Sequence, residues 1–120
     1  MIPKILIADS SSVMRTTIKN SLAESGFTDV TEAQDGGEAC IIFDNEKPDI
    51  VILDLSLPGK TGMETMRDMI KKNPKTKIIV CSASSYKELV IESVTLGAVD
   101  FIRKPLNTER LIKTINKIIS

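Results

Sequence analysis

The sequence predicts an α/β fold in which a doubly wound, five-stranded parallel sheet carries helices on both faces. Two observations support this prediction. Five short apolar segments alternate with five amphipathic segments along the chain, which is the pattern of repeated β-α units. Three of those segments, Ile5–Ala8, Ile50–Leu53 and Ile78–Cys81, are apolar throughout, as strands covered on both faces must be. The length of 120 residues fits one domain, residues 1–120.

The predicted strands differ in how deeply they should be buried. In chain order they are Ile5–Ala8, Val30–Ala33, Asp49–Asp54, Lys77–Cys81 and Val99–Ile102. The second and fifth contain polar residues, which edge strands tolerate more readily than central strands. With these two strands at the edges, the strand order 2-1-3-4-5 satisfies the burial pattern, and it is the flavodoxin-like order of doubly wound sheets.

Apolar residues at helical spacing predict the buried face of the connecting helices. The first three faces are formed by Met14, Ile18 and Leu22; by Ala39, Cys40 and Phe43; and by Met63, Met66 and Ile70. The fourth helix is predicted over Tyr86–Leu96. The last helix has Asn107 or Thr108 as its N-cap and is expected to bury five residues: Leu111, Ile112, Ile115, Ile118 and Ile119.

The composition excludes several classes of function. Sixteen Lys and Arg balance sixteen Asp and Glu, so the chain lacks the surplus of cations that nucleic-acid backbones require. It contains no histidine, which removes histidine-dependent catalysis and histidine-ligated metals. Cys40 and Cys81 lack the spacing of zinc or redox motifs, and we expect two buried, reduced thiols in a cytoplasmic protein. No apolar run reaches the roughly 18 residues of a membrane span.

Polar residues stand at the predicted carboxyl ends of four strands, where the functional crevice of such a sheet lies. They are Asp9, Asp54, Ser82 and Lys104. Two carboxylates about 4 Å apart repel each other by roughly 4 kcal/mol at an effective dielectric constant of 20, so the pair favours a bound cation. Hard oxygen ligands select Mg²⁺. The four residues therefore predict a site for Mg²⁺ and a phosphoryl group, with Asp54 as the nucleophile.

Each of these residues also has a purely structural interpretation. Asp9, which precedes three serines, fits the N-cap of the first helix, and Asp54 fits the start of a turn. Ser82 fits a strand end, and Lys104-Pro105 fits a surface turn. We favour the functional interpretation because the structural ones would have to hold at all four strand ends at once.

Four stretches carry a resemblance to a known family: residues 5–15 (ILIADSSSVMR), 53–59 (LDLSLPG), 81–83 (CSA) and 101–105 (FIRKP). Motif by motif, the chain resembles the receiver domain of two-component response regulators in its single-domain, CheY-like form. The resemblance implies that Asp54 accepts a phosphoryl group. It also implies that Asp9, Asp54 and the backbone carbonyl of Ser56 bind Mg²⁺, while Ser82 and Lys104 hold phosphoryl oxygens.

The resemblance further implies a phosphoprotein that acts as a signal-transduction switch rather than as an enzyme. Ser82 would move toward the phosphoryl group, and Phe101 stands where the family places an aromatic switch residue. The Lys104-Pro105 bond is often cis in this family. The implied partners are a histidine kinase or phosphotransfer protein and an output target that contacts the fourth helix, fifth strand and last helix. Nucleic acid and membrane are not expected as partners.

One position departs from the family pattern. Receivers usually carry two adjacent acids after the first strand, whereas Asp9 is followed here by Ser10. We therefore expect weaker Mg²⁺ binding than in receivers with both acids. The departure also keeps open an alternative function, a phosphorylation-independent interaction module (a pseudo-receiver).

Two other classes of function are disfavoured by single positions. An aspartate-nucleophile phosphatase needs a second acid two residues after the nucleophile, where Ser56 stands. A flavodoxin-like flavin binder needs a phosphate-cradling glycine, which the loop of residues 9–13 lacks.

Overall fold

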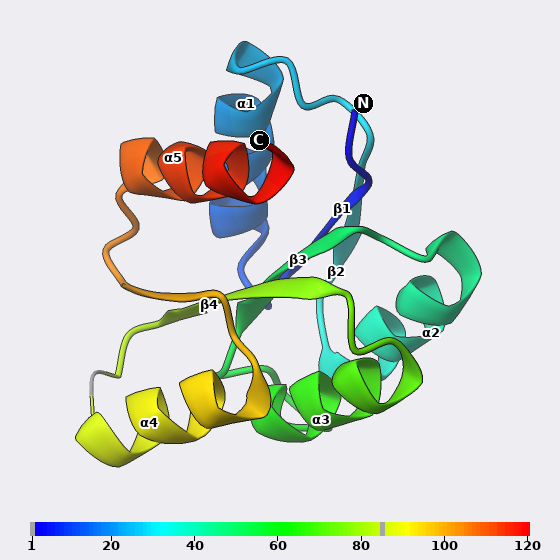
Figure 1. Cartoon of the computed structure of the whole chain (residues 1–120), viewed down its shortest axis with the longest axis vertical. Coiled ribbons are helices and arrows are strands. Elements are labelled where there is room, and N and C mark those ends of the chain that lie inside the picture. The colour runs from blue at the N-terminus through cyan, green and yellow to red at the C-terminus, as the bar shows by residue number, and fades with distance from the viewer. Residues whose placement is uncertain (1, 85) are drawn as a thin grey trace.

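The computed structural model describes residues 2–84 and 86–120, and within them five strands alternate with five helices (Figure 1). The strands are β1 (Ile5–Ala8), β2 (Val30–Ala33), β3 (Ile50–Asp54), β4 (Lys77–Ser82) and β5 (Asp100–Arg103). The helices are α1 (Ser12–Glu24), α2 (Gly36–Glu46), α3 (Gly62–Lys72), α4 (Lys87–Leu96) and α5 (Thr108–Ile119). No helix in this part of the chain is long and apolar enough to cross a membrane.

The strands form one parallel sheet in the order β2-β1-β3-β4-β5, which confirms the predicted topology. Every residue of β1 and β3 is buried, and β4 is exposed only at its first residue, Lys77. The edge strands β2 and β5 are less buried. The apolar runs of the sequence thus mark the central strands, because only these are covered on both faces.

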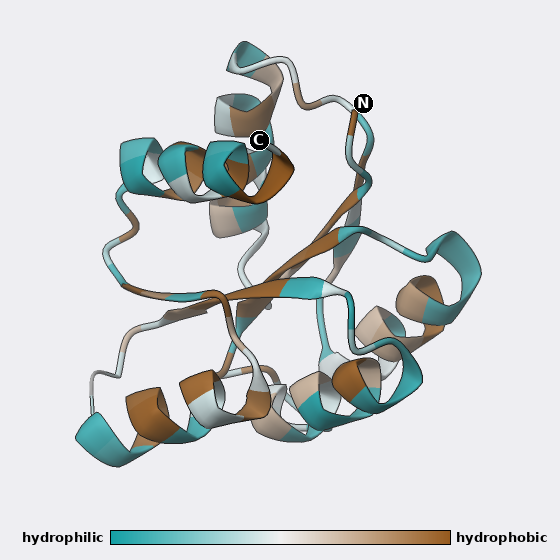
Figure 2. Ribbon diagram, viewed as in Figure 1, coloured by the Kyte–Doolittle hydropathy of each residue, from teal (hydrophilic) through white to brown (hydrophobic). Residues whose placement is uncertain are grey.

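Helices cover both faces of the sheet, as predicted. Figure 1 shows α1 and α5 on one face and α2, α3 and α4 on the other. Each face has its own core: Ile18 and Leu111 pack with one set of strand side chains, and Phe43 and Met66 pack with the other. The strands between the two layers are apolar along most of their length (Figure 2).

Three details differ from the predicted burial. In α3 the buried apolar side chains are Met66 and Met69, while the predicted Met63 and Ile70 are only half-buried, because the face of the helix that contacts the sheet is centred between the two buried methionines. In α5 only Leu111 and Ile115 are buried, whereas Ile112 and Ile118 are half-buried at the margin of the core. Ile119 is 38% exposed because it is the last residue of the helix. Cys40 is half-buried rather than buried, since it lies at the margin of the α2 contact face.

Cys81 is buried in β4, as predicted. Burial raises the pKa of the Cys81 thiol to about 12. The thiol is therefore protonated at neutral pH and is a packing residue, because the reactive form of cysteine is the thiolate.

Side chains cap four of the helices. The N-caps Ser11, Asp35, Thr61 and Asn107 accept hydrogen bonds from backbone N–H groups of the first turns of α1, α2, α3 and α5. Of the two N-caps predicted for the last helix, Asn107 is the one observed. Because Ser11 caps α1, the carboxylate of Asp9 is not needed for that structural role.

The Asp100 carboxylate links β5 to α5. Its Oδ1 accepts hydrogen bonds from the Arg110 guanidinium (2.7 Å) and the Phe101 backbone N–H (2.8 Å), and its Oδ2 accepts one from the Thr114 hydroxyl (2.8 Å). Burial acts to raise the pKa of Asp100, but the hydrogen bonds from Thr114 and Arg110 outweigh burial. The pKa of this carboxyl consequently lies below its ordinary value.

A carboxylate with a depressed pKa in the folded protein stabilises the fold above its unfolded pKa of about 3.9, and this stabilisation is lost as the pH falls through the folded pKa. We expect Asp100→Asn to lower the free energy of unfolding by about 1 kcal/mol at neutral pH. The difference from wild type should shrink below about pH 4. Urea unfolding across this range measures it, and an equal loss at every pH would contradict the assignment. Asp29→Asn, which alters an exposed carboxylate, is the matched control.

Candidate functional site

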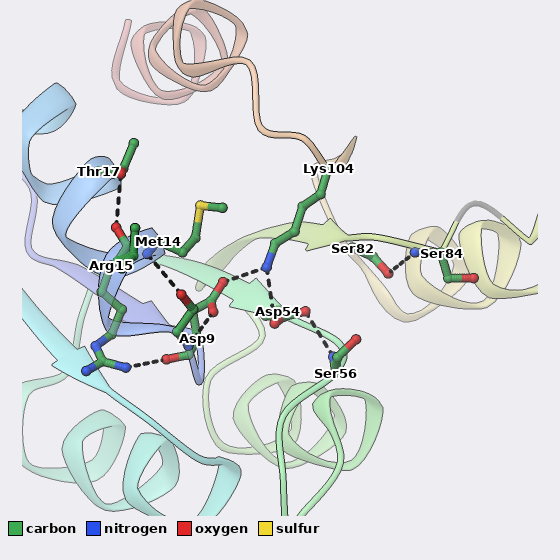
Figure 3. Close-up of polar contacts among 11 residues, drawn as sticks. Asp9, Met14, Arg15, Thr17, Asp54, Ser56, Ser82, Ser84 and Lys104 are labelled. Carbon is green, nitrogen blue, oxygen red and sulfur yellow. Dashed lines mark hydrogen bonds and ion pairs between the residues drawn. The ribbon is translucent and has the colours of Figure 1, made fainter.

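The four predicted site residues lie at the carboxyl ends of the strands, which form one edge of the sheet. Asp9 directly follows β1, Asp54 ends β3, Ser82 ends β4, and Lys104 directly follows β5. The parallel register aligns these strand ends, since Ala8 lies opposite Leu53, and Asp54 opposite Cys81. Figure 3 shows the Lys104 side chain pointing toward Asp9 and Asp54.

Lys104 lies between the two carboxylates. Its Nζ donates a hydrogen bond to Asp9 Oδ2 at 2.8 Å and to Asp54 Oδ2 at 3.3 Å (Figure 3). The carboxylate side chains are only 4% and 5% exposed, and that of Lys104 is 17% exposed. Burial acts to lower the pKa of Lys104, but the hydrogen bond to Asp9 and the charge of Asp54 outweigh burial and raise it above its ordinary value. The ammonium therefore stays charged and offsets the repulsion between the carboxylates.

The second oxygen of each carboxylate is held by its own loop. Asp9 Oδ1 accepts a hydrogen bond from the Ser11 backbone N–H at 2.9 Å, and Asp54 Oδ1 accepts one from the Ser56 backbone N–H at 3.0 Å. Both loops use the same short turn, in which an Asp side chain binds the backbone two residues ahead. The turn and the Lys104 ammonium together fix the orientation of both acids.

Ser82 lies on the same edge but has a different hydrogen-bond partner. Its Oγ accepts a hydrogen bond from the Ser84 backbone N–H at 3.1 Å, and within residues 2–84 and 86–120 no hydrogen bond joins it to either carboxylate. An open pocket of about 500 Å³ adjoins this edge, lined by Ser56, Ala83, Ser84 and Tyr86. Three of the four lining residues have small side chains, and the pocket lies beside the ends of β3 and β4.

The other predicted switch residue, Phe101, lies in β5, which is separated from the strand of Asp54 by β4. Its side chain is half-buried and packs against the core beneath α2, α3 and α4. The Lys104-Pro105 peptide bond that follows β5 is cis, the form that the family resemblance implies.

The donor set at this edge fits Mg²⁺. The two carboxylates and the backbone carbonyl of Ser56 are hard oxygen donors, and Mg²⁺ in proteins is commonly bound through one or two carboxylates with waters completing its shell. Among the described residues, no group of three or more His, Cys, Asp or Glu gathers to hold a metal ion. The site contains two acids because Asp9 is followed by an exposed serine, Ser10, rather than by a second acid. The site can thus accept Mg²⁺ with one anionic ligand fewer than two adjacent acids would give.

Arg15 contributes a contact at the site that was not predicted from the sequence. Its Nη1 donates to the backbone carbonyl of Asp9 at 2.7 Å, and its Nε pairs with Glu32 at 3.2 Å. Arg15 thereby anchors the loop that carries Asp9 to α1 and, through Glu32, to β2. Figure 3 shows the contact of Arg15 with Asp9. Only the contact itself reveals this role, because Arg15 and Glu32 are 17 residues apart in sequence.

The exposed ring of Tyr86 beside the pocket was also not predicted as part of the site. Tyr86 is 76% exposed and is the N-cap residue of α4. A tyrosine at the predicted start of a helix reads equally well as a packing residue, so the sequence offered no signal for its exposure.

The chain matches a known protein family and close sequence relatives. Residues 5–116 match the family model of the response regulator receiver domain. The chain is 40% identical over 114 residues to the chemotaxis protein CheY of Listeria monocytogenes, which covers 95% of this chain and 96% of that protein.

Solved structures of receiver domains have the same fold as this chain. A CheY-like receiver domain protein from Methanospirillum hungatei has a TM-score of 0.91 at 27% identity, covering 98% of this chain and 93% of that one. The CheX-CheY-BeF3-Mg²⁺ complex of Borrelia burgdorferi gives a TM-score of 0.92 at 27% identity, covering 98% of this chain and 89% of that one. The chain therefore belongs to the response regulator receiver domain family and has its CheY-like fold.

Proposed function

We propose that residues 1–120 act as one phosphorelay receiver domain, which takes a phosphoryl group onto Asp54 from the phosphohistidine of a kinase or phosphotransfer protein. The observation that carries this proposal is the Lys104 ammonium held between two buried carboxylates at the ends of β1 and β3. A purely structural ion pair has no need for a second buried acid, because burying charge is costly. A phosphoryl-transfer site needs both the acid pair and the cation.

The proposed transfer is an in-line displacement at phosphorus. A carboxylate oxygen of Asp54 forms a P–O bond while the P–N bond of the donor phosphohistidine breaks, and the imidazole nitrogen leaves with the electron pair and takes up a proton. Lys104 Nζ, already 3.3 Å from Asp54 Oδ2, supplies positive charge for the phosphoryl oxygens as they arrive. Asp54 becomes an aspartyl phosphate.

Asp9, Asp54 and the Ser56 carbonyl would hold Mg²⁺. When bound, the ion neutralises the charge of the phosphoryl oxygens and orients them. The chain itself holds Asp9 ready, because Ser11 binds Asp9 Oδ1 and Arg15 binds the Asp9 backbone carbonyl. The Borrelia burgdorferi relative was crystallised with BeF3 and Mg²⁺, which supports the same chemistry here.

The proposed output is a change of binding affinity rather than turnover of a substrate. The Ser82 hydroxyl would exchange its hydrogen bond with Ser84 for one with the phosphoryl group, and Phe101 would follow in β5. The face formed by α4, β5 and α5 would contact the output target. Exposed apolar side chains on and beside α4 support this assignment: Tyr86, Ile91 and Val94.

Fluoroberyllate, which mimics a phosphoryl group, tests the proposal. In amide NMR spectra, fluoroberyllate with Mg²⁺ is expected to shift the resonances of Ser56, Ser82 and Lys104, and with them those of Phe101 and α4. Asp54→Asn should show none of these shifts, while Asp29→Asn, the matched control, should behave like wild type. Wild-type spectra that stay unchanged would contradict the proposal and favour the pseudo-receiver. That alternative is supported by the site itself, where no group of three acids gathers among the described residues.

Ser10→Asp is expected to tighten Mg²⁺ binding. A new carboxylate about 4 Å from a divalent ion contributes roughly 2 kcal/mol in bulk water, and ordering its side chain reduces this gain to about tenfold in affinity. Ser10 is exposed, so the new side chain meets no steric barrier in the core. Calorimetric titration with MgCl₂ measures the change. An unchanged affinity would show that position 10 does not face the metal, and Ser12→Asp, another exposed position of this segment, is the control.

A further inference from the structure

The backbone of Asp9 lies where the pairing of β1 with β2 ends. Its N–H donates to the carbonyl of Ala33, the last residue of β2, at 3.1 Å. In a longer parallel ladder, the Asp9 carbonyl would accept a backbone N–H two residues beyond Ala33. The chain has left the sheet at that point, because Asp35 is the N-cap of α2. The Asp9 carbonyl therefore takes its hydrogen bond from outside the sheet.

Arg15 supplies the donor for this carbonyl. Its Nη1 lies 2.7 Å from the Asp9 backbone oxygen (Figure 3). The Arg15 side chain is only 16% exposed, so the contact is largely shielded from water. Hydrogen bonds from a charged donor are shorter and stronger than those between neutral groups. Arg15 thus takes the place that further residues of β2 would fill in a longer strand.

Glu32 fixes the direction of the Arg15 guanidinium. Arg15 Nε pairs with Glu32 Oε1 at 3.2 Å, and Glu32 lies in β2 opposite Ile7. A planar guanidinium presents its donors in a fixed fork, whereas the ammonium of a lysine is a single point charge. Lys19 pairs with the other oxygen of Glu32 at 3.4 Å, and within residues 2–84 and 86–120 no hydrogen bond joins it to Asp9. Only Arg15 therefore connects Glu32 with the loop of Asp9.

The position of the Asp9 carboxylate depends on this backbone contact. Asp9 Oδ1 accepts the Ser11 backbone N–H at 2.9 Å, a bond that lies within the loop itself. Asp9 Oδ2 accepts from Lys104 at 2.8 Å, and a bound cation would compete with that ammonium. The exposed Ser10 that follows supplies no second carboxylate. The single acid of this loop is therefore placed by its backbone, which Arg15 holds.

We propose that Arg15 is a positioning residue for Mg²⁺: by bridging the Asp9 carbonyl and Glu32, it holds the Asp9 carboxylate in place for the ion. This inference rests on the phosphoacceptor function proposed above. Removing a group that orients a metal ligand from behind lowers metal affinity by about 10- to 100-fold. Charge alone predicts the opposite sign, because the loss of a nearby cation should tighten the binding of Mg²⁺.

Calorimetric titration with MgCl₂ distinguishes the two effects. Arg15→Ala is expected to bind Mg²⁺ about tenfold more weakly than wild type. Arg15→Lys keeps the charge but loses the fork, so it should also bind more weakly, and it provides a second test should Arg15→Ala fail to fold. Lys19→Ala is the matched control, because it removes a positive charge from the same Glu32 carboxylate without a contact to Asp9. Its affinity should stay within about twofold of wild type.

Nitrogen-15 relaxation of the metal-free protein gives a readout that does not depend on the ion. Arg15→Ala should increase the picosecond-to-nanosecond mobility of the Ser10 and Ser11 amides, whereas Lys19→Ala should leave it unchanged. Urea unfolding of the same variants records their stability, so that a loss of folded protein is not mistaken for a loss of orientation.

Three results would overturn the inference. A less stable Arg15→Ala variant with wild-type affinity for Mg²⁺ would make Arg15 a structural residue only. Tighter binding of Mg²⁺ by this variant would assign its effect to charge. Ser10 and Ser11 amides as rigid as in wild type would show that Arg15 does not hold the loop. Each of these results leaves the proposed function intact, whereas a wild-type protein that binds no Mg²⁺ would contradict both.

Discussion

Asp54→Asn is expected to abolish the uptake of a phosphoryl group from acetyl phosphate and Mg²⁺. The substitution keeps the size of the side chain and its acceptor for the Ser56 backbone N–H, but it replaces the nucleophilic carboxylate oxygen with an amide. Intact-mass spectrometry should show wild type gaining the mass of one phosphoryl group and the variant gaining none. This is the largest effect we expect, because no other carboxylate can take the place of Asp54 as the acceptor of the phosphoryl group.

The control for this experiment is Asp29→Asn, which removes an exposed carboxylate that makes no ion pair in the described chain. It should gain the phosphoryl mass as wild type does. Uptake by Asp54→Asn at the wild-type level would show that another side chain is the acceptor. Absence of uptake in wild type as well would instead favour the pseudo-receiver.

Lys104→Ala is expected to have the second largest effect, and it should act on stability and metal binding in opposite directions. Removing the ammonium leaves two carboxylates, 4% and 5% exposed, without their counter-charge. Breaking a buried ion pair in this way costs about 3 kcal/mol of unfolding free energy. The same loss of positive charge should tighten Mg²⁺ binding by about tenfold, since the ion no longer competes with the ammonium.

Urea unfolding with and without Mg²⁺ separates these effects. Mg²⁺ should restore more stability to Lys104→Ala than it adds to wild type, because it supplies the missing counter-charge. Arg103→Ala, which truncates the exposed neighbouring side chain, should stay within about 0.5 kcal/mol of wild type. A Lys104→Ala variant as stable as wild type without Mg²⁺ would mean that the ammonium does not offset the acids' repulsion.

The fold was predictable because its signals are local and repeated. The apolar runs at Ile5–Ala8 and Ile50–Leu53 identify strands covered on both faces. Their burial separates central from edge strands, and the flavodoxin-like order, which satisfies that pattern, is the observed one. Prediction was wrong at Ile119, which is the last residue of α5, and at Cys40, which lies at the margin of the contact face of α2.

The site was partly predictable for the same topological reason. In a parallel sheet the residues that follow the strands share one edge, so Asp9, Asp54 and Lys104 were expected together without knowledge of any contact. The hydrogen bonds that orient them were not predictable. The contact of Arg15 with the Asp9 carbonyl depends on where α1 packs, and the sequence holds no local signal for it.

The central claim, that Asp54 carries the phosphoryl group, is tested most directly by locating the modified residue. Borohydride reduces an aspartyl phosphate to homoserine and leaves free carboxylates unchanged. After treatment with acetyl phosphate, Mg²⁺ and borohydride, peptide mass spectrometry should find homoserine at position 54 and an unchanged Asp9. Homoserine at Asp9 or at any other acid, with Asp54 intact in a protein that has gained the phosphoryl mass, would contradict the account.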